Sequence, residues 1–587
     1  MRSPLLRYAL AAGVALATLA AGGAPAAAKP RPVDVQLLSY TDFHGYLTPM
    51  NNVNDGTIKD AQGNTLIVGG APYIATHLKR LREGKRNTIT FSTGDAFSGW
   101  PVEVSQHADE PTIEFMNKIG TSFNAVGNHE LDRSLEFLRD HIGKGECFGV
   151  VGEDSCFLDS DGQMFGGAKF TTSSANITMK GSTEPIFAPY LIKRFGNVKV
   201  GFINLTTPTT VTGSTSYQPS LGELPLVETA NKYAAELSRR GVKAIVVNLH
   251  EGGAAGTDFN GCNSALTGPV ADFAKNASPE IDAIITGHWH AAFNCSIPDP
   301  AGNPRPVVEA SNHGRLLNEM NLKIDVRTKD VIRDSIVSVN HAVTRDVTPD
   351  PEMVTMVDYW NAKAKETYAR PVAKITGDLT RVRDADGEST LGNTVADAAY
   401  ADGQTTGGGA DLAMVAVAPV KGSNSLRGDL LYAKGANPAD SDGTVLFGEA
   451  WAAWGYANPV LTVSVTGAQI EQALEQQWQT QANGTVRFAP LAVSGNVRFS
   501  YDLSKAVGDR VLAQNVLING QPLDPAKTYR LAALAYTLLG ADGYTAFAGY
   551  TDAIRGERDY EAFRTYLRKA GTLTPPALDR AIALPAG

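Results

Sequence analysis

The sequence predicts an α/β protein made of two blocks that are joined by a helix. Residues 33–345 repeat one pattern, in which a short β-rich run is followed by a polar or glycine-containing turn and then by helix-like sequence. From residue 371 the sequence pattern changes, and strand-like runs of alternating hydrophobicity mix with amphipathic helix patterns. We therefore expect an N-terminal α/β domain over 33–345 and a smaller α+β domain over 371–587.

Composition and charge are those of an ordinary globular protein. Of the 587 residues, 43% are hydrophobic and 19% are charged, which excludes disordered, collagen-like and coiled-coil chains. The 52 Lys and Arg residues against 61 Asp and Glu residues give a net charge of −9. Such a chain lacks the broad basic surface that binds a nucleic acid polymer, so we expect no partner of that kind.

Residues 1–28 have the pattern of a secretory signal peptide. Arg2 and Arg7 precede an apolar run over 8–20, and the segment ends in three alanines at Ala28. The alternative, a membrane anchor, needs about 20 apolar residues, and this run is shorter. We expect cleavage near Ala28 and a mature protein that is secreted or periplasmic and not attached to a membrane.

Five β-rich runs of the first block each end in a turn that contains Asp, Asn or His. The runs are 35–40, 88–92, 123–126, 244–249 and 281–286, and the turns contain, in order, Asp42 and His44, Asp95, Asn128 and His129, His250, and His288 and His290. Ligands gather at the carboxyl ends of strands in sheets covered by helices, so these side chains are expected to converge. Imidazole and carboxylate groups together suit zinc, manganese or related divalent ions.

The first of these turns also predicts a local geometry. If the chain stays extended after Tyr40, Asp42 and His44 point the same way and can hold one ion. Glu130 and Glu251 adjoin the candidate residues and are interpreted as structural. The remaining histidines lack a strand-end context and are interpreted as ordinary surface or core residues: His77, His107, His141, His313 and His341.

The four cysteines are too few for a disulfide-built scaffold, but export permits local bridges. Cys147 and Cys156 are neighbours in sequence, as are Cys262 and Cys295, and we favour these two pairs among the three connectivities. Zinc ligation is the alternative, although no C-x2-C spacing occurs, and free buried thiols also stay open.

A helix is expected between the two blocks, within residues 346–370. Apolar residues recur there at helical spacing between flanking prolines at 349, 351 and 371. These apolar residues are Met353, Met356, Val357 and Trp360.

The motifs D-x-H, G-D, G-N-H-E-x-D, H and G-H-x-H, in this order, resemble those of the calcineurin-like metallophosphoesterases. The whole mature chain resembles the secreted 5'-nucleotidase/UDP-sugar hydrolase family, which adds a C-terminal domain for nucleotide specificity. The resemblance implies a four-layer α/β/β/α catalytic domain over 33–345 and a C-terminal nucleotide-binding domain over 371–587.

The resemblance also implies two divalent metal ions, zinc, manganese or similar. One ion would be held by Asp42, His44, Asp95 and His290, and the other by Asp95, Asn128, His250 and His288. His129 matches the family's catalytic histidine that is not a ligand, with Asp132 orienting it. Two such ions acidify a bridging water, so the implied reaction is in-line attack of a metal-bridging hydroxide at phosphorus.

In this family the second domain stacks a base between two aromatic rings. Gly455-Tyr456-Ala457-Asn458 stands where the family usually reads Pro-Phe-Gly-Asn, and Tyr536 matches the second ring. Asp542 would accept hydrogen bonds from the ribose. Arg427 falls where the family reads Asn-Gly-Gly-Gly-Ile-Arg, although most of those glycines are replaced. The implied substrate-binding residues are Arg427, Tyr456, Asn458, Tyr536 and Asp542, with Arg383 as a weaker candidate for a phosphate contact.

These observations favour the interpretation that the protein is a secreted phosphohydrolase that removes phosphate from 5'-nucleotides. Two alternatives on the same scaffold are a 2',3'-cyclic nucleotide phosphodiesterase/3'-nucleotidase and a UDP-sugar hydrolase. An alternative of a different class is a secreted binding protein with a vestigial site, which the intact set of ligand residues disfavours.

Overall fold

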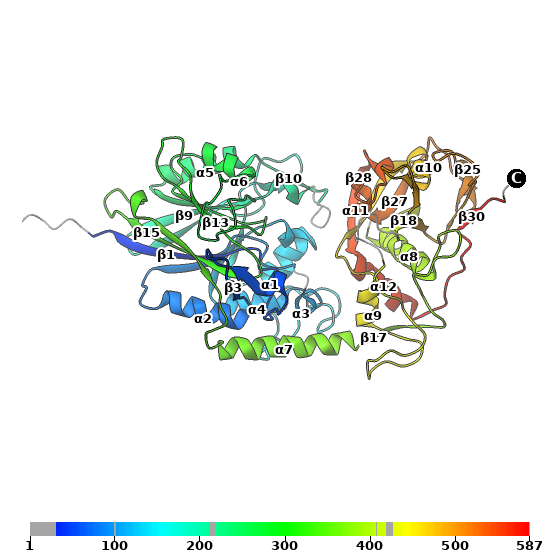
Figure 1. Ribbon diagram of the computed structural model, residues 1–587, viewed down its shortest axis with the longest axis horizontal. Helices are drawn as coiled ribbons and strands as arrows, with labels where there is room; N and C mark the ends of the chain where they lie inside the picture. The colour runs from blue at the N-terminus through cyan, green and yellow to red at the C-terminus, as the bar shows by residue number, and fades with distance from the viewer. Residues whose placement is uncertain (1–30, 99–100, 212–217, 407, 418–425, 586–587) are drawn as a thin grey trace, which may run out of the picture.

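The computed structural model describes residues 31–98, 101–211, 218–406, 408–417 and 426–585, so the predicted signal peptide lies outside the described residues. The chain forms two lobes, with the N-terminal lobe in blue to green and the C-terminal lobe in yellow to red (Figure 1). Within the described ranges, no helix has both the length and the apolar character that a membrane span requires.

The N-terminal lobe contains two six-stranded sheets. The first has the order β16-β15-β1-β4-β5-β6, and its strands are β1 (Val33–Tyr40), β4 (Thr88–Ser92), β5 (Thr121–Ala125), β6 (Thr171–Ser173), β15 (Leu316–Ile324) and β16 (Val337–Ala342). The second has the order β13-β14-β12-β11-β9-β8, and its strands are β8 (Tyr190–Phe195), β9 (Val198–Thr206), β11 (Ala244–His250), β12 (Ala283–Thr286), β13 (Ala292–Ser296) and β14 (Pro306–Ala310).

Apolar side chains join the two sheets face to face. The ring of Phe202 in the second sheet lies 5.5 Å from that of Phe91 and 5.0 Å from that of Phe123 in the first. Strands β1, β4, β5 and β6 run parallel, as do β9, β11, β12 and β14. Because parallel strands end at one edge, the turns that follow β1, β4, β5, β11 and β12 can meet there.

Helices cover the outer face of each sheet. Leu38 and Tyr40 share one core with residues of the helices α2 (Ala71–Arg82), α4 (Glu110–Lys118) and α7 (Pro351–Tyr368). On the other sheet, Ile245 and Ile284 share a core with α5 (Leu226–Arg239) and α6 (Pro269–Asn276). The layers are therefore α/β/β/α, which confirms the predicted fold of this lobe.

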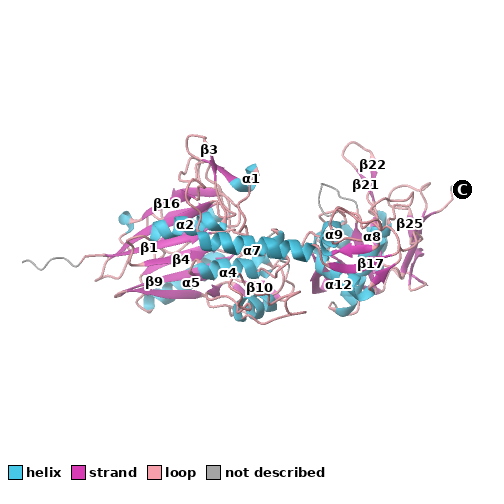
Figure 2. Ribbon diagram, turned by 90° about the horizontal axis from the view of Figure 1, so that it is seen from below, coloured by secondary structure: helices cyan, strands magenta, loops and turns pink. Residues whose placement is uncertain are grey.

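Helix α7 (Pro351–Tyr368) lies within the segment expected to connect the two blocks, and Figure 2 shows it running from one lobe to the other. The Asp350 carboxylate caps its first turn by accepting from the Met353 amide, at 3.2 Å. Trp360 is buried and donates from Nε1 to the Glu114 carboxylate, at 2.7 Å. The helix is thus fixed to the N-terminal lobe along its buried face.

The C-terminal lobe is built on a five-stranded sheet of order β23-β18-β27-β20-β28. Its strands are β18 (Leu412–Ala416), β20 (Pro459–Thr466), β23 (Leu491–Val493), β27 (Thr528–Leu534) and β28 (Thr551–Arg558). Helices α8 (Thr390–Thr405) and α12 (Asp559–Ala570) share a hydrophobic core with one face of this sheet. Helix α10 (Gly467–Glu475) and a second sheet, of four strands, share another core with the opposite face. Mixed strands and helices of this kind confirm the α+β class.

Shorter elements complete both lobes. In the N-terminal lobe these are α1 (Val53–Gly56), β2 (Thr57–Lys59), β3 (Thr65–Ile67), α3 (Val102–Ser105), β7 (Ile177–Met179) and β10 (Leu221–Glu223). In the C-terminal lobe they are β17 (Pro371–Ile375), β19 (Thr444–Leu446), α9 (Phe447–Ala453), β21 (Trp478–Thr480), β22 (Val486–Phe488), β24 (Val497–Tyr501), β25 (Val511–Ile518), β26 (Gln521–Pro522), α11 (Ala535–Leu538), β29 (Thr572–Leu573) and β30 (Ala581–Ala583).

Two disulfides confirm the cysteine pairing that the sequence favours. Cys147 is bonded to Cys156, and Cys262 to Cys295. Each bridge closes a short loop, with sequence separations of 9 and 33 residues. The first loop also contributes acidic residues to the contact between the lobes.

Side chains of the C-terminal lobe contact the loop that follows His129. Arg555 donates hydrogen bonds to the backbone carbonyls of Asp132 and Arg133. The Arg133 guanidinium lies 2.5 Å from the Glu561 carboxylate of α12. Further ion pairs across the interface join Asp154 to Arg564 and Arg568, and Glu153 to Arg568.

Candidate metal centre

The predicted ligands meet at the edge where the parallel strands end. Six of them form two groups in which one possible ligand atom from each residue lies within 4.8 Å of the others. The groups are Asp42 with His44 and His290, and Asp95 with His250 and His288. Four of the five strand-end turns therefore converge, although they are far apart in the sequence. The turn after β5 joins them, because the His129 amide donates to Asp95 Oδ1 at 2.8 Å.

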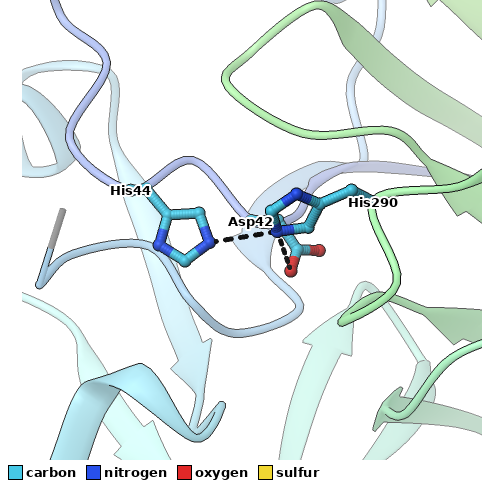
Figure 3. A group of neighbouring side chains, drawn as sticks. All are labelled: Asp42, His44 and His290. Atoms are coloured by element: carbon cyan, nitrogen blue, oxygen red, sulfur yellow. Dashed lines mark hydrogen bonds and ion pairs between the residues drawn. The ribbon is translucent and has the colours of Figure 1, made fainter. Parts of the chain in front are cut away.

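The first group brings together side chains from the turn after β1 and the turn after β12 (Figure 3). His44 Nε2 lies 3.3 Å from His290 Nε2, and His290 Nε2 lies 3.5 Å from Asp42 Oδ1. Three ligand atoms that face one another suit a divalent cation placed among them. His290 is positioned from behind, because its Nδ1 lies within hydrogen-bond distance, 3.0 Å, of the Asn312 side-chain amide.

The second group surrounds a buried position at the end of β11. His250 Nδ1 lies 2.9 Å from the Thr93 carbonyl, and His250 Nε2 lies 3.0 Å from Asp95 Oδ2. A proton on Nδ1 is donated to that carbonyl, which leaves Nε2 as the ligand atom. Asn128 Oδ1 is buried here and has no hydrogen-bond partner among the described residues. An acceptor in that situation fits a cation, because burial without a partner is costly.

The Asp95 carboxylate lies between the two groups. Its Oδ2 is 3.0 Å from His250 Nε2 and 3.9 Å from His44 Nε2. Its other oxygen, Oδ1, accepts from the His129 amide at 2.8 Å. The carboxylate thus lies close to a histidine of each group.

The backbone of these turns is not extended, so the extended chain considered for Asp42 and His44 is wrong, although both residues do lie in one ligand group. Both residues have positive φ angles, 49° and 50°, as do Asp95, His288 and His290. The physical reason is that the Asp42 and His44 amides donate to the carbonyls of Gly94 and Asp95, both at 3.0 Å. These hydrogen bonds hold the turn after β1 against the turn after β4. Left-handed conformations cost energy in such residues and cluster at functional sites.

Glycines allow the turns to approach so closely. A Cβ at Gly127 would lie 2.2 Å from Asp95 Oδ1, and one at Gly287 would lie 2.2 Å from Thr41 Oγ1. The Glu130 carboxylate holds the same turns by accepting from the amides of Asp95 and Gly127, at 2.8 and 2.7 Å. Glu130 is therefore structural, as the sequence suggested.

Burial and neighbouring charges set the protonation of the ligands. Burial holds the pKa of His44 well below its ordinary value and lowers the pKa of His288 to about 4, so both are neutral. Burial opposes ionisation of Asp95, but neighbouring His250 outweighs it and keeps the Asp95 pKa well below its ordinary value. Neutral imidazoles and an ionised carboxylate are the forms that bind metal.

His250 behaves differently because it faces Asp95. Burial opposes its protonation, but the Asp95 carboxylate outweighs that effect and raises the His250 pKa to about 9. A proton on Nε2 therefore stands where a cation would bind, and metal binding at this position must release it.

His129 and Asp132 form a pair beside both groups. His129 Nδ1 lies 2.7 Å from Asp132 Oδ2, and the ring centre of His129 lies 5.0 Å from that of His44. Burial lowers the His129 pKa, but the carboxylates of Asp132 and Asp95 outweigh it and raise the pKa to about 10. His129 is thus protonated at neutral pH and can donate from Nε2.

Several residues that support the site carry no sequence motif. Thr41 donates to the Asp42 carboxylate at 2.6 Å, and Thr93 and Asn312 contact ligand histidines as described above. In the sequence, Thr41 and Thr93 are marked only by their position directly before the motifs D-x-H and G-D. His313 also lacks a motif; it is buried, with its ring centre 5.6 Å from that of His290.

Two of the predicted substrate residues lie against each other in the C-terminal lobe. The Arg427 guanidinium is 3.8 Å from the centre of the Tyr456 ring, which is a cation–π contact. The buried Asp559 carboxylate shapes the loop by accepting from the amides of Tyr456 and Ala457, at 2.9 and 3.0 Å. Ala457 has a φ of 62°, at the position where the family usually has glycine.

The other predicted substrate residues have different surroundings. Tyr536 is half-buried in α11, and Asp542 is buried and accepts from Thr537 Oγ1 at 3.2 Å. Burial raises the Asp542 pKa to about 6. Asn458 Oδ1 is buried without a hydrogen-bond partner in the described chain. Arg383 is exposed; nearby, Arg381 donates to the Arg427 carbonyl, at 2.6 Å.

Two family models match the chain. The model of the calcineurin-like phosphoesterases matches residues 37–292, and that of the 5'-nucleotidase C-terminal domain matches residues 371–549. The chain is 26% identical over 577 residues to the cell wall protein Lmo0130 of Listeria monocytogenes, covering 93% of this chain and 68% of that protein.

It is also 25% identical over 527 residues to the snake venom 5'-nucleotidase of Naja atra, covering 86% of this chain and 91% of that protein. The solved structure of the NAD nucleotidase of Haemophilus influenzae has the same fold, with a TM-score of 0.57 at 18% identity, over 95% of this chain and all of that chain.

Fold, site and family matches together define the class of this protein, a metal-dependent phosphoric ester hydrolase. The chain belongs to the family that joins a calcineurin-like phosphoesterase domain to a 5'-nucleotidase C-terminal domain.

Replacing Gly127 by alanine should damage the metal centre, because the new methyl group collides with the Asp95 carboxylate. We expect affinity for Mn²⁺ to fall by about tenfold or more, the size of effect seen when the supports of metal ligands are removed. Isothermal titration with Mn²⁺ measures it. Gly166→Ala is the matched control, since a Cβ there has nothing within 4 Å. Equal affinity in the two variants would show that the close approach at Gly127 is unimportant.

Proposed function

We propose that this protein is a secreted phosphohydrolase that uses two divalent metal ions to remove phosphate from 5'-nucleotides. The observation that carries the proposal is the Asp95 carboxylate, which lies between two groups of imidazole and carboxylate ligands. The match to the 5'-nucleotidase C-terminal domain, and the likeness to a venom 5'-nucleotidase over 91% of its length, support nucleotides as the substrate class.

The donor set fits two ions of the zinc or manganese type. Asp42, His44, Asp95 and His290 would hold one ion, and Asp95, Asn128, His250 and His288 would hold the other. Two such ions supply positive charge to phosphoryl oxygens and acidify water for in-line attack at phosphorus. Imidazole and carboxylate ligands suit several divalent ions of this type.

The protein's own contribution to the reaction is positioning and proton transfer. Protonated His129 is fixed through Nδ1 by Asp132, so its Nε2 would stabilise charge on a phosphoryl oxygen or protonate the leaving oxygen. The C-terminal lobe would bind the nucleoside, with Tyr456 and Tyr536 stacking on the base and Asp542 accepting from the ribose. Arg427 would contact phosphate, with Arg383 the weaker candidate for this role.

Export also belongs to this proposal. The signal-like segment 1–28 would direct the chain out of the cytoplasm, and the two disulfides suit an oxidising compartment. The expected partner is a small nucleotide rather than a nucleic acid polymer.

Purified protein supplied with Mn²⁺ or Zn²⁺ should release phosphate from AMP, and EDTA should abolish the release because the ligand groups then lose their ions. A colorimetric phosphate assay measures both outcomes. Restoring activity by adding the metal back controls for damage by the chelator. Absence of release from AMP, ADP, ATP and UDP-glucose would refute the proposal.

Replacing His129 by alanine should lower the turnover of AMP by about 10²–10⁴-fold, the usual contribution of a proton-transfer group. Metal content should not change, because His129 is not among the proposed ligands. Steady-state kinetics and metal analysis of the purified variant test the two parts. Loss of metal in His129→Ala would mean that the residue is a ligand after all.

Replacing Tyr456 or Tyr536 by alanine should weaken nucleotide hydrolysis by the equivalent of about 1–3 kcal/mol in kcat/KM, the range for stacking on one base. Hydrolysis of glycerol phosphate, which has no base to stack, should be unchanged in the same variants. Comparing kcat/KM for AMP and glycerol phosphate gives the answer, and equal losses on both substrates would argue against a stacking role.

A further inference from the structure

A fully buried carboxylate lies against the loop 456–458, which carries two of the candidate substrate-binding residues. Asp559 is the first residue of α12, and its exposed fraction is 0%. Its Oδ2 accepts from the Tyr456 amide at 2.9 Å and, more weakly, from the Asn458 amide at 3.4 Å. Its Oδ1 accepts from the Ala457 amide at 3.0 Å. One side chain therefore holds all three backbone amides of the loop.

The carboxylate itself has a fixed place, because it belongs to the first turn of α12. Its Oδ1 also accepts from the Tyr560 amide at 2.7 Å, and the Asp559 amide donates to the Asn458 carbonyl at 2.8 Å. Negative charge is favourable at the start of a helix, where the first amides are without helical partners. The same turn contacts the N-terminal lobe, which α12 faces in Figure 1, since Glu561 lies 2.5 Å from the Arg133 guanidinium.

The loop needs this support because of the conformation of Ala457. Its φ is 62°, in the left-handed region, which costs energy in any residue that has a Cβ. Without an acceptor for its amide, Ala457 would favour negative φ angles, and the neighbouring Tyr456 ring would turn with the backbone. That ring lies 3.8 Å from the Arg427 guanidinium. The hydrogen bonds to Asp559 therefore offset the strain and keep the ring in this position.

We propose that Asp559 is a positioning residue for the nucleoside, which holds Tyr456 and Asn458 in the conformation that receives the base and the ribose. The inference rests on the proposed function, in which Tyr456 stacks on the base. It gives a role in nucleotide recognition to a residue outside every motif of the sequence, one that acts through the loop and not on the substrate itself. When only a fraction of the molecules has a competent loop, affinity falls by that fraction.

Asp559→Asn tests the role with little change in shape. The substitution replaces one acceptor oxygen by an NH2 group, and because both oxygens accept from the loop, either orientation of the new side chain sets a donor against a loop amide. KM for AMP should rise about tenfold, the effect of leaving a buried amide without its acceptor, with kcat little changed. Both constants for glycerol phosphate, which has no base, should stay those of the wild type.

A second substitution distinguishes positioning from general stability. Glycine adopts a positive φ without steric cost, so adding Ala457→Gly to Asp559→Asn should recover part of the KM for AMP. Glu475→Gln is the matched control, because Glu475 is a buried carboxylate of the same lobe that accepts from the amides of a different loop, at Gly508 and Val511. KM for AMP should not change in Glu475→Gln.

Calorimetric titration with adenosine separates this inference from the proposed function. Adenosine carries no phosphate, so its binding does not depend on hydrolysis, and Asp559→Asn should weaken it about tenfold. If the wild type hydrolyses no phosphate ester but loses adenosine affinity on this substitution, the proposed function fails and the inference stands. Unchanged adenosine affinity, or an equal rise in KM for AMP and glycerol phosphate, would overturn the inference.

If Asp559→Asn does not fold, Ala457→Val takes its place. Valine disfavours the left-handed conformation but leaves the carboxylate and the core intact. KM for AMP should rise about tenfold in this variant, and hydrolysis of glycerol phosphate should be unaffected. A wild-type KM for AMP in Ala457→Val would contradict the inference, because the conformation that Asp559 holds would then be irrelevant to nucleotide binding.

Discussion

The shared Asp95 carboxylate is the interaction on which the catalytic edge is organised. It is buried, yet it stays ionised because His250 and protonated His129 lie around it. Without those partners burial would raise its pKa, and the two ligand groups would lose their common negative charge. The same carboxylate raises the pKa of both histidines. Carboxylate and imidazole therefore fix each other's charge, so a change in one alters the metal affinity and the proton transfer together.

The fold supplies this carboxylate at the cost of backbone strain. Parallel strands bring several turns to one edge, and each turn must then fold sharply so that its polar side chain points inward. Asp42, Asp95 and His288 do this with positive φ angles, and Gly127 leaves room for the Asp95 side chain. Glu130 stabilises the arrangement by accepting several of the freed amides. Strain at the site is thus offset by hydrogen bonds within the same turns.

In the proposed function the C-terminal lobe binds the nucleoside and the N-terminal lobe holds the metal ions, but the two lobes are not independent. Arg555 of the C-terminal lobe binds the backbone that follows Asp132, which itself holds His129. The loop of the Cys147–Cys156 disulfide adds further ion pairs to the same interface. The C-terminal lobe thus contacts the peptide segment that carries Asp132, the partner of His129.

The sequence by itself determined the α/β class and the turns that supply the candidate ligands, because these are local patterns with a fixed order along the chain. It favoured the pairing of the cysteines, which the two disulfides of the structure then decided. It did not determine how those turns are bent: Asp42 and His44 are not extended, since their amides bond to a distant turn. Nor could it reveal Asn312 behind His290. Only tertiary structure decided these features, because each depends on segments that meet in space after the sheets have formed.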